Sequence, residues 1–278
     1  MSAKLQLMLQ QRQWAESIGL MPSSQGYLAT VEENLFQPLN KTTKEAFENG
    51  SGSELKDTSH LAKMKALHSS SALVANFFDF WVGSDLSTLS TALGLDSKAT
   101  SIKFEEQFPT RLPGNPPNLD VVLELQDGQV IGIESKFSEW LTPKSKNGPA
   151  FKAKYFSDGQ QRWKNLFLPK AQNLAEAINN GEESFLYLDA PQLLKHALGM
   201  ATELGNRFSL LYVYFDWESA ESELHSQEID RFSALVDDSL GFKSLSYQKL
   251  FAIMHAIGNV DEKYMSYLSR RYFNSLAS

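Results

Sequence analysis

The sequence predicts an α/β protein, more closely an α+β domain in which helices flank a mixed central β-sheet. Two stretches of strand character, 121–125 and 130–136, are separated by a turn signal. A third stretch, 208–215, is short and almost wholly apolar, as expected for a buried central strand. Helical patterns precede, separate and follow these stretches, and this alternation predicts a mixed sheet covered by helices.

The N-terminal part predicts a helical extension. Residues 1–50 are polar with helical character, interrupted by Pro22 and Pro38, and a Gly/Ser-rich break follows at 49–53. We therefore divide the chain into an extension, 1–57, and a main domain, 58–278. The apolar spacing after the break predicts one long helix, capped near Ser59 and continuing to Trp81.

The period changes after Ser101, where Ile102 and Phe104 indicate a strand before the Pro/Gly/Asn-rich stretch 112–118. Two further helices are predicted at 158–180 and 189–204. The tail from Ser222 is predicted to be helical throughout.

Composition excludes several function classes. The chain has 278 residues, 42% hydrophobic and 21% charged, which is typical of a globular protein. It has no cysteine, so disulfides and Cys-ligated zinc are excluded, and its five histidines show no paired metal-ligand spacing. A Gly-rich phosphate loop is absent. No secretory leader and no apolar run of about 20 residues is present, so we expect a cytoplasmic protein with no membrane partner.

The charge distribution is uneven. The formal net charge is −7, but residues 142–170 hold seven basic residues and one acid, a net +6, so the rest of the chain carries −13. A local basic stretch on an acidic protein is typical of a restricted phosphate-binding surface. A solvated loop and helix face is the alternative explanation. Within this stretch Trp163 and Tyr155 fit base stacking or contact with the DNA backbone, and core packing is the alternative for Trp163.

The turn signal at Asp127-Gly128 predicts the register of a hairpin. A three-residue loop, 126–128, puts Gly128 at the left-handed position that such loops need. Counting back along both strands sets Asp120 opposite Glu134, with paired Cβ atoms ~5 Å apart. Asp120, Glu134 and Lys136 then share one face, with Gly132 leaving room beside them.

Two facing carboxylates are unfavourable unless a cation lies between them. A divalent ion such as Mg²⁺ suits this arrangement because it takes one or two carboxylates and keeps several waters. Lys136 would position or help to deprotonate one of those waters, and the backbone carbonyl of Ser135 is a further candidate ligand. An edge hairpin with a surface salt bridge is the alternative. The chain has three other acid-x-Lys triplets without this strand context: Glu54-Leu-Lys56, Asp96-Ser-Lys98 and Asp261-Glu-Lys263.

Asp120 at the start of one strand and Glu134-Ser135-Lys136 at the end of the next resemble the PD-(D/E)XK nuclease superfamily. The Pro and Asp of that signature are not adjacent here, because Pro117 precedes Asp120 by three residues. More narrowly, the stretches 68–78, 133–139 and 192–194 resemble a group of bacterial proteins described as restriction endonucleases. The resemblance spans about residues 60–260 and leaves the first ~55 residues without a counterpart.

The resemblance implies a restriction-endonuclease-like core and a Mg²⁺-dependent DNA endonuclease, with Mn²⁺ able to substitute. It implies a further acid near the metal, Glu105 or Glu106, of which Glu105 fits the pattern better. Gln192 matches a glutamine that often lies near the site, and Glu139 matches the narrower group but could instead pair with Lys144. The expected partner is double-stranded DNA, and a homodimer and a cognate DNA methyltransferase are candidate protein partners.

We expect the following residues to contact DNA: Lys144, Lys146, Lys152, Lys154, Arg162, Lys164 and Gln192. A type II restriction enzyme is the leading interpretation. A repair or mobile-element nuclease on the same core, and a catalytically silent DNA-binding or assembly module, remain alternatives.

Overall fold

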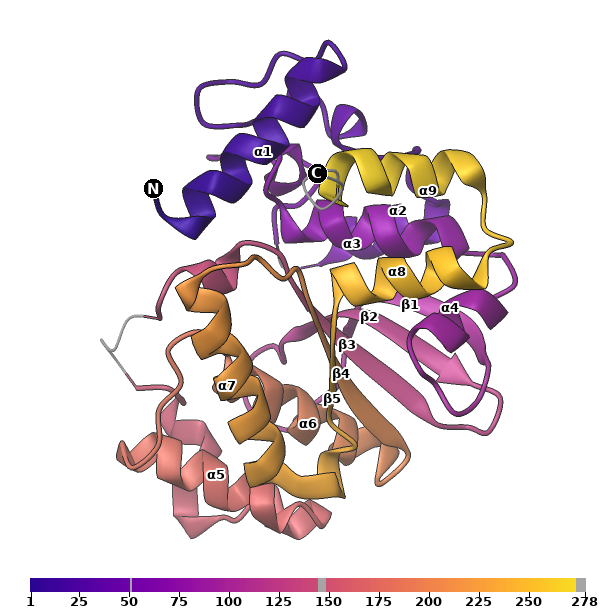
Figure 1. The fold of residues 1–278 in the computed structure, drawn as a ribbon. Helices are drawn as coiled ribbons and strands as arrows, with labels where there is room; N and C mark the ends of the chain where they lie inside the picture. The colour runs from indigo at the N-terminus through magenta and orange to yellow at the C-terminus, as the bar shows by residue number, and fades with distance from the viewer. Residues whose placement is uncertain (51, 145–148, 274–278) are drawn as a thin grey trace.

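The computed structural model describes residues 1–50, 52–144 and 149–273 and has a five-stranded mixed sheet at its centre (Figure 1). The spatial order of the strands follows the chain. The first two pairings are antiparallel and the last two parallel. The strands are β1 (Ala99–Gln107), β2 (Asn118–Leu125), β3 (Val130–Lys136), β4 (Phe208–Tyr214) and β5 (Lys243–Ser246). The predicted mixed sheet flanked by helices is confirmed.

Helices lie on both faces of this sheet (Figure 1). In the described part of the chain the α-helices are α1 (Ala3–Ser17), α2 (Lys41–Asn49), α3 (Ser70–Phe78), α4 (Ser87–Ala92), α5 (Pro169–Asn180), α6 (Ala190–Leu204), α7 (Ala220–Val236), α8 (Tyr247–Ile257) and α9 (Glu262–Leu268). Short helical turns join them, among them η2 (Lys63–Lys65), η3 (Asp79–Trp81), η7 (Lys164–Leu166) and η9 (Ser269–Phe273).

The hairpin register follows the prediction. Gly128 has φ +82° and donates its N–H to the carbonyl of Leu125 at 3.0 Å, which closes the three-residue loop. The ladder pairs Glu124 with Val130 and continues to Val121 with Ile133. One residue further along, the same register sets Asp120 opposite Glu134, so the predicted register is confirmed.

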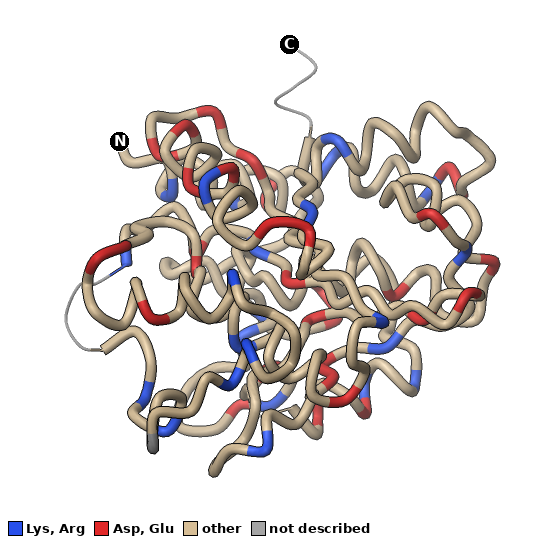
Figure 2. Tube along the Cα trace, turned by 90° about the horizontal axis from the view of Figure 1, so that it is seen from below, with Lys and Arg blue, Asp and Glu red and all other residues tan. Residues whose placement is uncertain are grey.

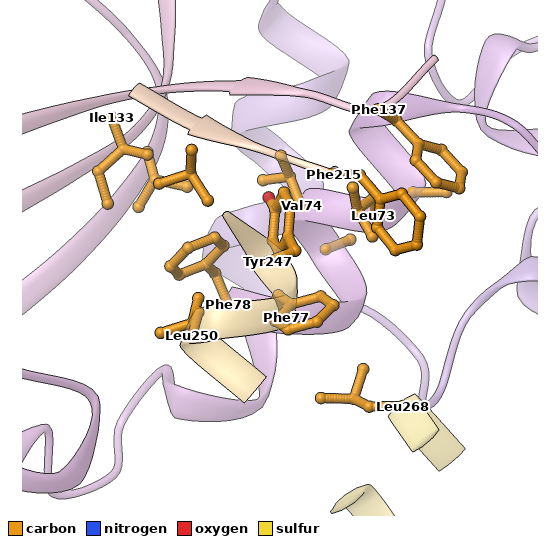
Figure 3. Close-up of a cluster of buried hydrophobic side chains, with 14 of the residues drawn as sticks. Leu73, Val74, Phe77, Phe78, Ile133, Phe137, Phe215, Tyr247, Leu250 and Leu268 are labelled. Atoms are coloured by element: carbon orange, nitrogen blue, oxygen red, sulfur yellow. The ribbon is translucent and has the colours of Figure 1, made fainter. Parts of the chain in front are cut away.

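One face of the sheet packs against helices from both ends of the chain. Ile133 and Phe137 meet α3 and α8, whose Phe77, Phe78 and Tyr247 fill the centre of the layer (Figure 3). Residues of α1 and α2 belong to the same buried cluster. The segment 1–57 therefore contributes to the core that covers the sheet, while the domain boundary at 57/58 stays a prediction.

The opposite face is covered by α5, α6 and α7. Trp163 is fully buried there and donates its indole N–H to the carbonyl of Leu194 at 2.8 Å. Tyr155 is 4% exposed and stacks on Trp163. For Trp163 the alternative of core packing is confirmed; Tyr155 is buried as well, so base stacking by either residue is wrong.

Several predicted element boundaries are wrong. The helix expected from Ser59 to Trp81 begins only at Ser70, capped by the Ser69 hydroxyl, and becomes the turn η3 after Phe78. The stretch before Ser70 is a loop that contains the short helical turn η2. Asp57 accepts the N–H of Ala62 at 2.8 Å and thereby stabilises this loop. Residues 158–168 form short helical turns rather than helix, and β5 lies within the tail predicted as helix.

Within the described residues, none of the helices combines the length and the apolar character needed to cross a bilayer.

Candidate active site

Three carboxylates lie side by side across the first three strands. The registers of the two hairpins set Asp120 on β2 between Glu105 on β1 and Glu134 on β3. The backbone N–H of Ser135 donates to Oδ2 of Asp120 at 2.7 Å, which orients that carboxylate toward β3. Asp120 is half-buried and Glu134 is 2% exposed. The hairpin therefore brings the two predicted metal ligands together.

Two nitrogen-bearing side chains contact Glu134. The ammonium of Lys136, two residues along the same face of β3, donates to Oε1 of Glu134. Nε2 of His196 lies 2.9 Å from Oε2 of the same carboxylate, and both side chains are almost fully buried. The carboxylate thus has one partner from its own strand and one from helix α6.

The two neighbouring carboxyl groups have pKa values shifted in opposite directions. Burial, and then the charge of Glu134, raises the pKa of Asp120 well above its usual value. Burial would also raise the pKa of Glu134, but Lys136 and His196 outweigh it and lower that pKa to about 2. Burial opposes the charge on Lys136, yet Glu134 and Asp120 together raise its pKa. Lys136 therefore stays protonated at neutral pH.

Glu105 completes the row on the edge strand. Its backbone is in the left-handed region at φ +53°, which is uncommon for a non-glycine residue. The side-chain amide of Asn118 donates to its Oε2 at 2.5 Å. Burial raises the pKa of Glu105, which the charges of Glu54 and Glu134 also favour. The charge of Glu105 contributes to raising the pKa of Asp120, whereas the charge of Glu106 acts on Lys103. Of the two predicted acids, Glu105 is therefore the one beside the site.

Helix α6 packs over β3 so that every fourth residue of the helix meets every second residue of the strand. The Lys136 ammonium donates to Oε1 of Gln192 at 3.2 Å, and His196, one turn later, contacts Glu134. One turn further, Met200 lies over Gly132, where an added Cβ would be 2.7 Å from its sulfur. The interpretation that Gly132 leaves room beside the carboxylates is therefore wrong, because Met200 fills that room.

The start of α6 is held by two acids. Asp189 caps the helix by accepting the N–H of Gln192 at 3.0 Å. Glu228 of α7 accepts the consecutive N–H groups of Leu186, Tyr187 and Leu188 at 2.6–2.9 Å. These bonds orient the helix that carries Gln192 and His196.

The donor set fits a hard divalent cation. In the described ranges 1–50, 52–144 and 149–273, no three His, Asp or Glu side chains converge into a ready cage. Mg²⁺ needs only one or two carboxylates, however, and completes its shell with water. The raised pKa of Asp120 beside Glu134 indicates a site that is short of positive charge. Asp120 and Glu134 are the residues that would hold the ion, with the Ser135 carbonyl as a predicted further ligand.

The predicted DNA-contacting residues are in different environments. Lys152 and Lys164 are exposed. Lys154 donates to the carbonyl of Pro113, and Arg162 donates to the carbonyl of Lys154 at 3.2 Å. Lys146 lies outside the described residues. Figure 2, seen from below, shows several Lys and Arg positions close together near the centre of the view.

Lys144 pairs with Asp189, the cap of α6, and not with Glu139. Glu139 instead accepts the N–H of Phe137 at 2.9 Å, directly after the Glu-x-Lys triplet. The suggested Glu139–Lys144 pair is therefore wrong.

His196, Lys195 and Phe167 were not assigned to the site by sequence reasoning. The signal for His196 was its spacing of four from Gln192, which sets both on one helix face. The amino group of Lys195 lies 5.1 Å from the ring centre of Phe151, beside the basic stretch. Phe167 is 91% exposed, with φ +62°, between Lys164 and Lys170.

One protein-family model, described as restriction endonuclease associating with ARP, matches residues 4–273. The match includes the N-terminal segment for which sequence reasoning found no counterpart. No curated protein and no solved structure matches the chain significantly.

Proposed function

We propose that this chain, which belongs to the family described as restriction endonuclease associating with ARP, is a Mg²⁺-dependent DNA endonuclease of the PD-(D/E)XK type. Family membership supports a nuclease role. The observation that supports this particular chemistry is the contiguous row of Glu105, Asp120 and Glu134, with Lys136 beside it. A type II restriction activity on double-stranded DNA is the proposed physiological role.

Each side chain has a distinct role in this proposal. Asp120 and Glu134 would hold the ion, which would supply charge stabilisation at the scissile phosphate and lower the pKa of a water molecule. Lys136 remains an ammonium, because the neighbouring carboxylates raise its pKa. It therefore donates a hydrogen bond to the attacking water or to the phosphate, and does not take up the proton of that water.

DNA would be held by the basic stretch, which contacts helix α6 through the Lys144–Asp189 pair. Lys152 and Lys164 are the best candidates for phosphate contacts, since both are exposed. Arg162 is a weaker candidate because its guanidinium already donates to Lys154 and to the hydroxyl of Ser157. Phe167, exposed between two lysines, is positioned to stack on a base or a sugar.

Plasmid cleavage tests the proposal. Supercoiled DNA is incubated with the protein and Mg²⁺, Mn²⁺ or EDTA. We expect cutting only with metal, and its loss in Glu134→Ala and Lys136→Ala. Lys103→Ala and Glu124→Ala are matched controls, because they remove an exposed 2.6 Å ion pair between the neighbouring strands β1 and β2 of the same sheet. Metal-independent cutting, or unchanged cutting by either site variant, would reject the proposal.

The cleavage products separate the alternatives. Discrete fragments support a site-specific restriction enzyme, whereas nicking or a smear supports a repair or mobile-element nuclease. A protein that binds DNA without cutting it under all three conditions would be the silent module.

A further inference from the structure

We propose that His196 is a positioning residue that holds Glu134 in its orientation toward Asp120, so that helix α6 sets the affinity of the site for a divalent cation. This inference rests on the proposed function. The His196 side chain is 1% exposed, and its Nε2 lies 2.9 Å from Oε2 of Glu134. Among the described residues neither atom forms a hydrogen bond of good geometry, so this close approach is the one polar contact of each.

Four side chains form a chain of three contacts between β3 and α6. His196 contacts Glu134, Glu134 accepts from Lys136, and Lys136 donates to Gln192. The spacings match: two residues of a strand span roughly 6.6 Å, and four residues of a helix roughly 6.0 Å. Both catalytic side chains of the strand are thus anchored on one face of one helix.

Helix α6 is not free to follow a moving carboxylate. Met200 packs against Gly132, and an added Cβ on Gly199 would come within 2.4 Å of the carbonyl oxygen of Phe108. The helix is therefore packed against β3 through Met200 and against the segment after β1 through the adjacent Gly199. A side chain on so constrained a helix can impose an orientation on Glu134.

The contact becomes decisive when DNA is bound. In the proposed reaction Lys136 turns toward water or phosphate, and its bond to Oε1 of Glu134 is given up. The contact with His196 of α6 then remains to orient the Glu134 carboxylate. Partners of metal-binding side chains typically change metal affinity 10- to 100-fold when they are removed.

Two polar replacements that differ by one methylene test this role. In His196→Gln the amide nitrogen reaches the position of Nε2, whereas in His196→Asn it ends short of Glu134. Binding of Mn²⁺ alone is measured by calorimetry without DNA, and cleavage kinetics are measured in parallel. We expect the Asn variant to bind Mn²⁺ about 10- to 100-fold more weakly and the Gln variant within about threefold of the unaltered protein. DNA affinity in EDTA should change less than twofold.

His225→Gln is the matched control. This second buried histidine contacts the hydroxyl of Tyr212 at 2.9 Å and stacks on Trp140, and among the described residues it forms no ion pair with Glu134 or Asp120. We expect its replacement to lower stability but to leave Mn²⁺ affinity within twofold.

Equal Mn²⁺ affinity in the Gln and Asn variants would overturn the inference. An Asn variant that does not fold would also overturn it, because the contact would then serve folding instead of positioning. If the unaltered protein cuts DNA with metal but the two variants behave alike, the inference fails and the proposed function stands. If the unaltered protein neither binds Mn²⁺ nor cuts, both fail.

Discussion

Asp120 and Glu134 show how neighbours decide the chemistry of identical functional groups. Both carboxyl groups project from adjacent strands into the same half-buried site. Glu134 contacts Lys136 and His196 and is held ionised, whereas Asp120 has one backbone donor and a like-charged neighbour. A carboxylate that is short of positive charge is one that a cation would stabilise, and this asymmetry underlies the proposed metal site.

Asp120→Asn should make the metal-free protein more stable at pH 7. A raised pKa means that the folded state prefers the protonated carboxyl group, so Asp120 lowers stability as pH rises above its usual value of 3.8. Asn removes that cost and also removes a metal ligand. Urea unfolding at pH 7 should show the higher midpoint, and added Mg²⁺ should stabilise only the unaltered protein. A lower midpoint for the variant would contradict the argument.

Glu134→Gln should have the opposite pH dependence. The pKa of Glu134 is lowered from 4.5 to about 2, so its ionised form favours folding above pH 4.5, and this contribution is lost as pH falls toward 2. Stability measured from pH 7 to pH 3 should therefore fall more steeply for the unaltered protein than for Glu134→Gln. Parallel curves would show that Glu134 does not contribute in this way.

At the scale of elements, the fold depends on how closely α6 approaches the sheet. Gly132 lies on β3 and Gly199 on α6, and at each of them an added Cβ would come closer than 3.0 Å to another part of the chain. At Gly132 an added Cβ meets the flexible ends of Met200 and Leu119, whereas at Gly199 it meets the backbone of Phe108. Side chains can yield and a packed backbone cannot.

Gly199→Ala should therefore destabilise the protein by roughly 1–3 kcal/mol, although alanine is the better helix former by about 1 kcal/mol. Gly132→Ala should cost less, because Met200 and Leu119 can change rotamer. Denaturant unfolding of the two variants gives the comparison. Equal stability of Gly199→Ala and the unaltered protein would mean that α6 does not pack tightly on the segment after β1.

Local signals predicted some elements and not others. The β2–β3 hairpin was predictable to the residue, since Gly128 and the alternation of the strands specify turn and register together. The helix predicted from Ser59 to Trp81 was too long. Several of its apolar residues are buried in the core although they belong to the loop before α3, so burial alone did not indicate a helix. β5 was missed, since four residues that gain their pairing only from β4 carry little local pattern.

At the scale of the whole molecule, a buried arginine ties the two ends of the chain together. Arg271 is 1% exposed, and no carboxylate pairs with it among the described residues. It donates to the carbonyl and side-chain oxygens of Asn34 at 2.7 and 2.5 Å, and its guanidinium lies 4.3 Å from the ring centre of Trp14. These contacts join η9 to the N-terminal segment, beside α1 (Figure 1).

Arg271→Met should lower stability by more than ~2 kcal/mol, because it leaves the buried side-chain oxygen of Asn34 without its donor and takes one of two donors from the Asn34 carbonyl, which keeps Asn76. Arg270→Ala, at the exposed neighbouring position, is the matched control and should change stability by less than ~0.5 kcal/mol. A single unfolding transition monitored by tryptophan fluorescence measures both. Similar values for the two variants would show that the two ends of the chain are not coupled through Arg271.

The sequence by itself determined the hairpin: its turn, its register and the facing pair of Asp120 and Glu134, because these depend on residues less than 20 positions apart. Tertiary structure decided what surrounds that pair. Gln192 and His196 are more than 55 residues from Lys136 and Glu134, and they reach them only because α6 packs across β3. No local pattern specifies such a packing, since it depends on shape matched between distant segments, here Met200 on Gly132 and Gly199 on Phe108.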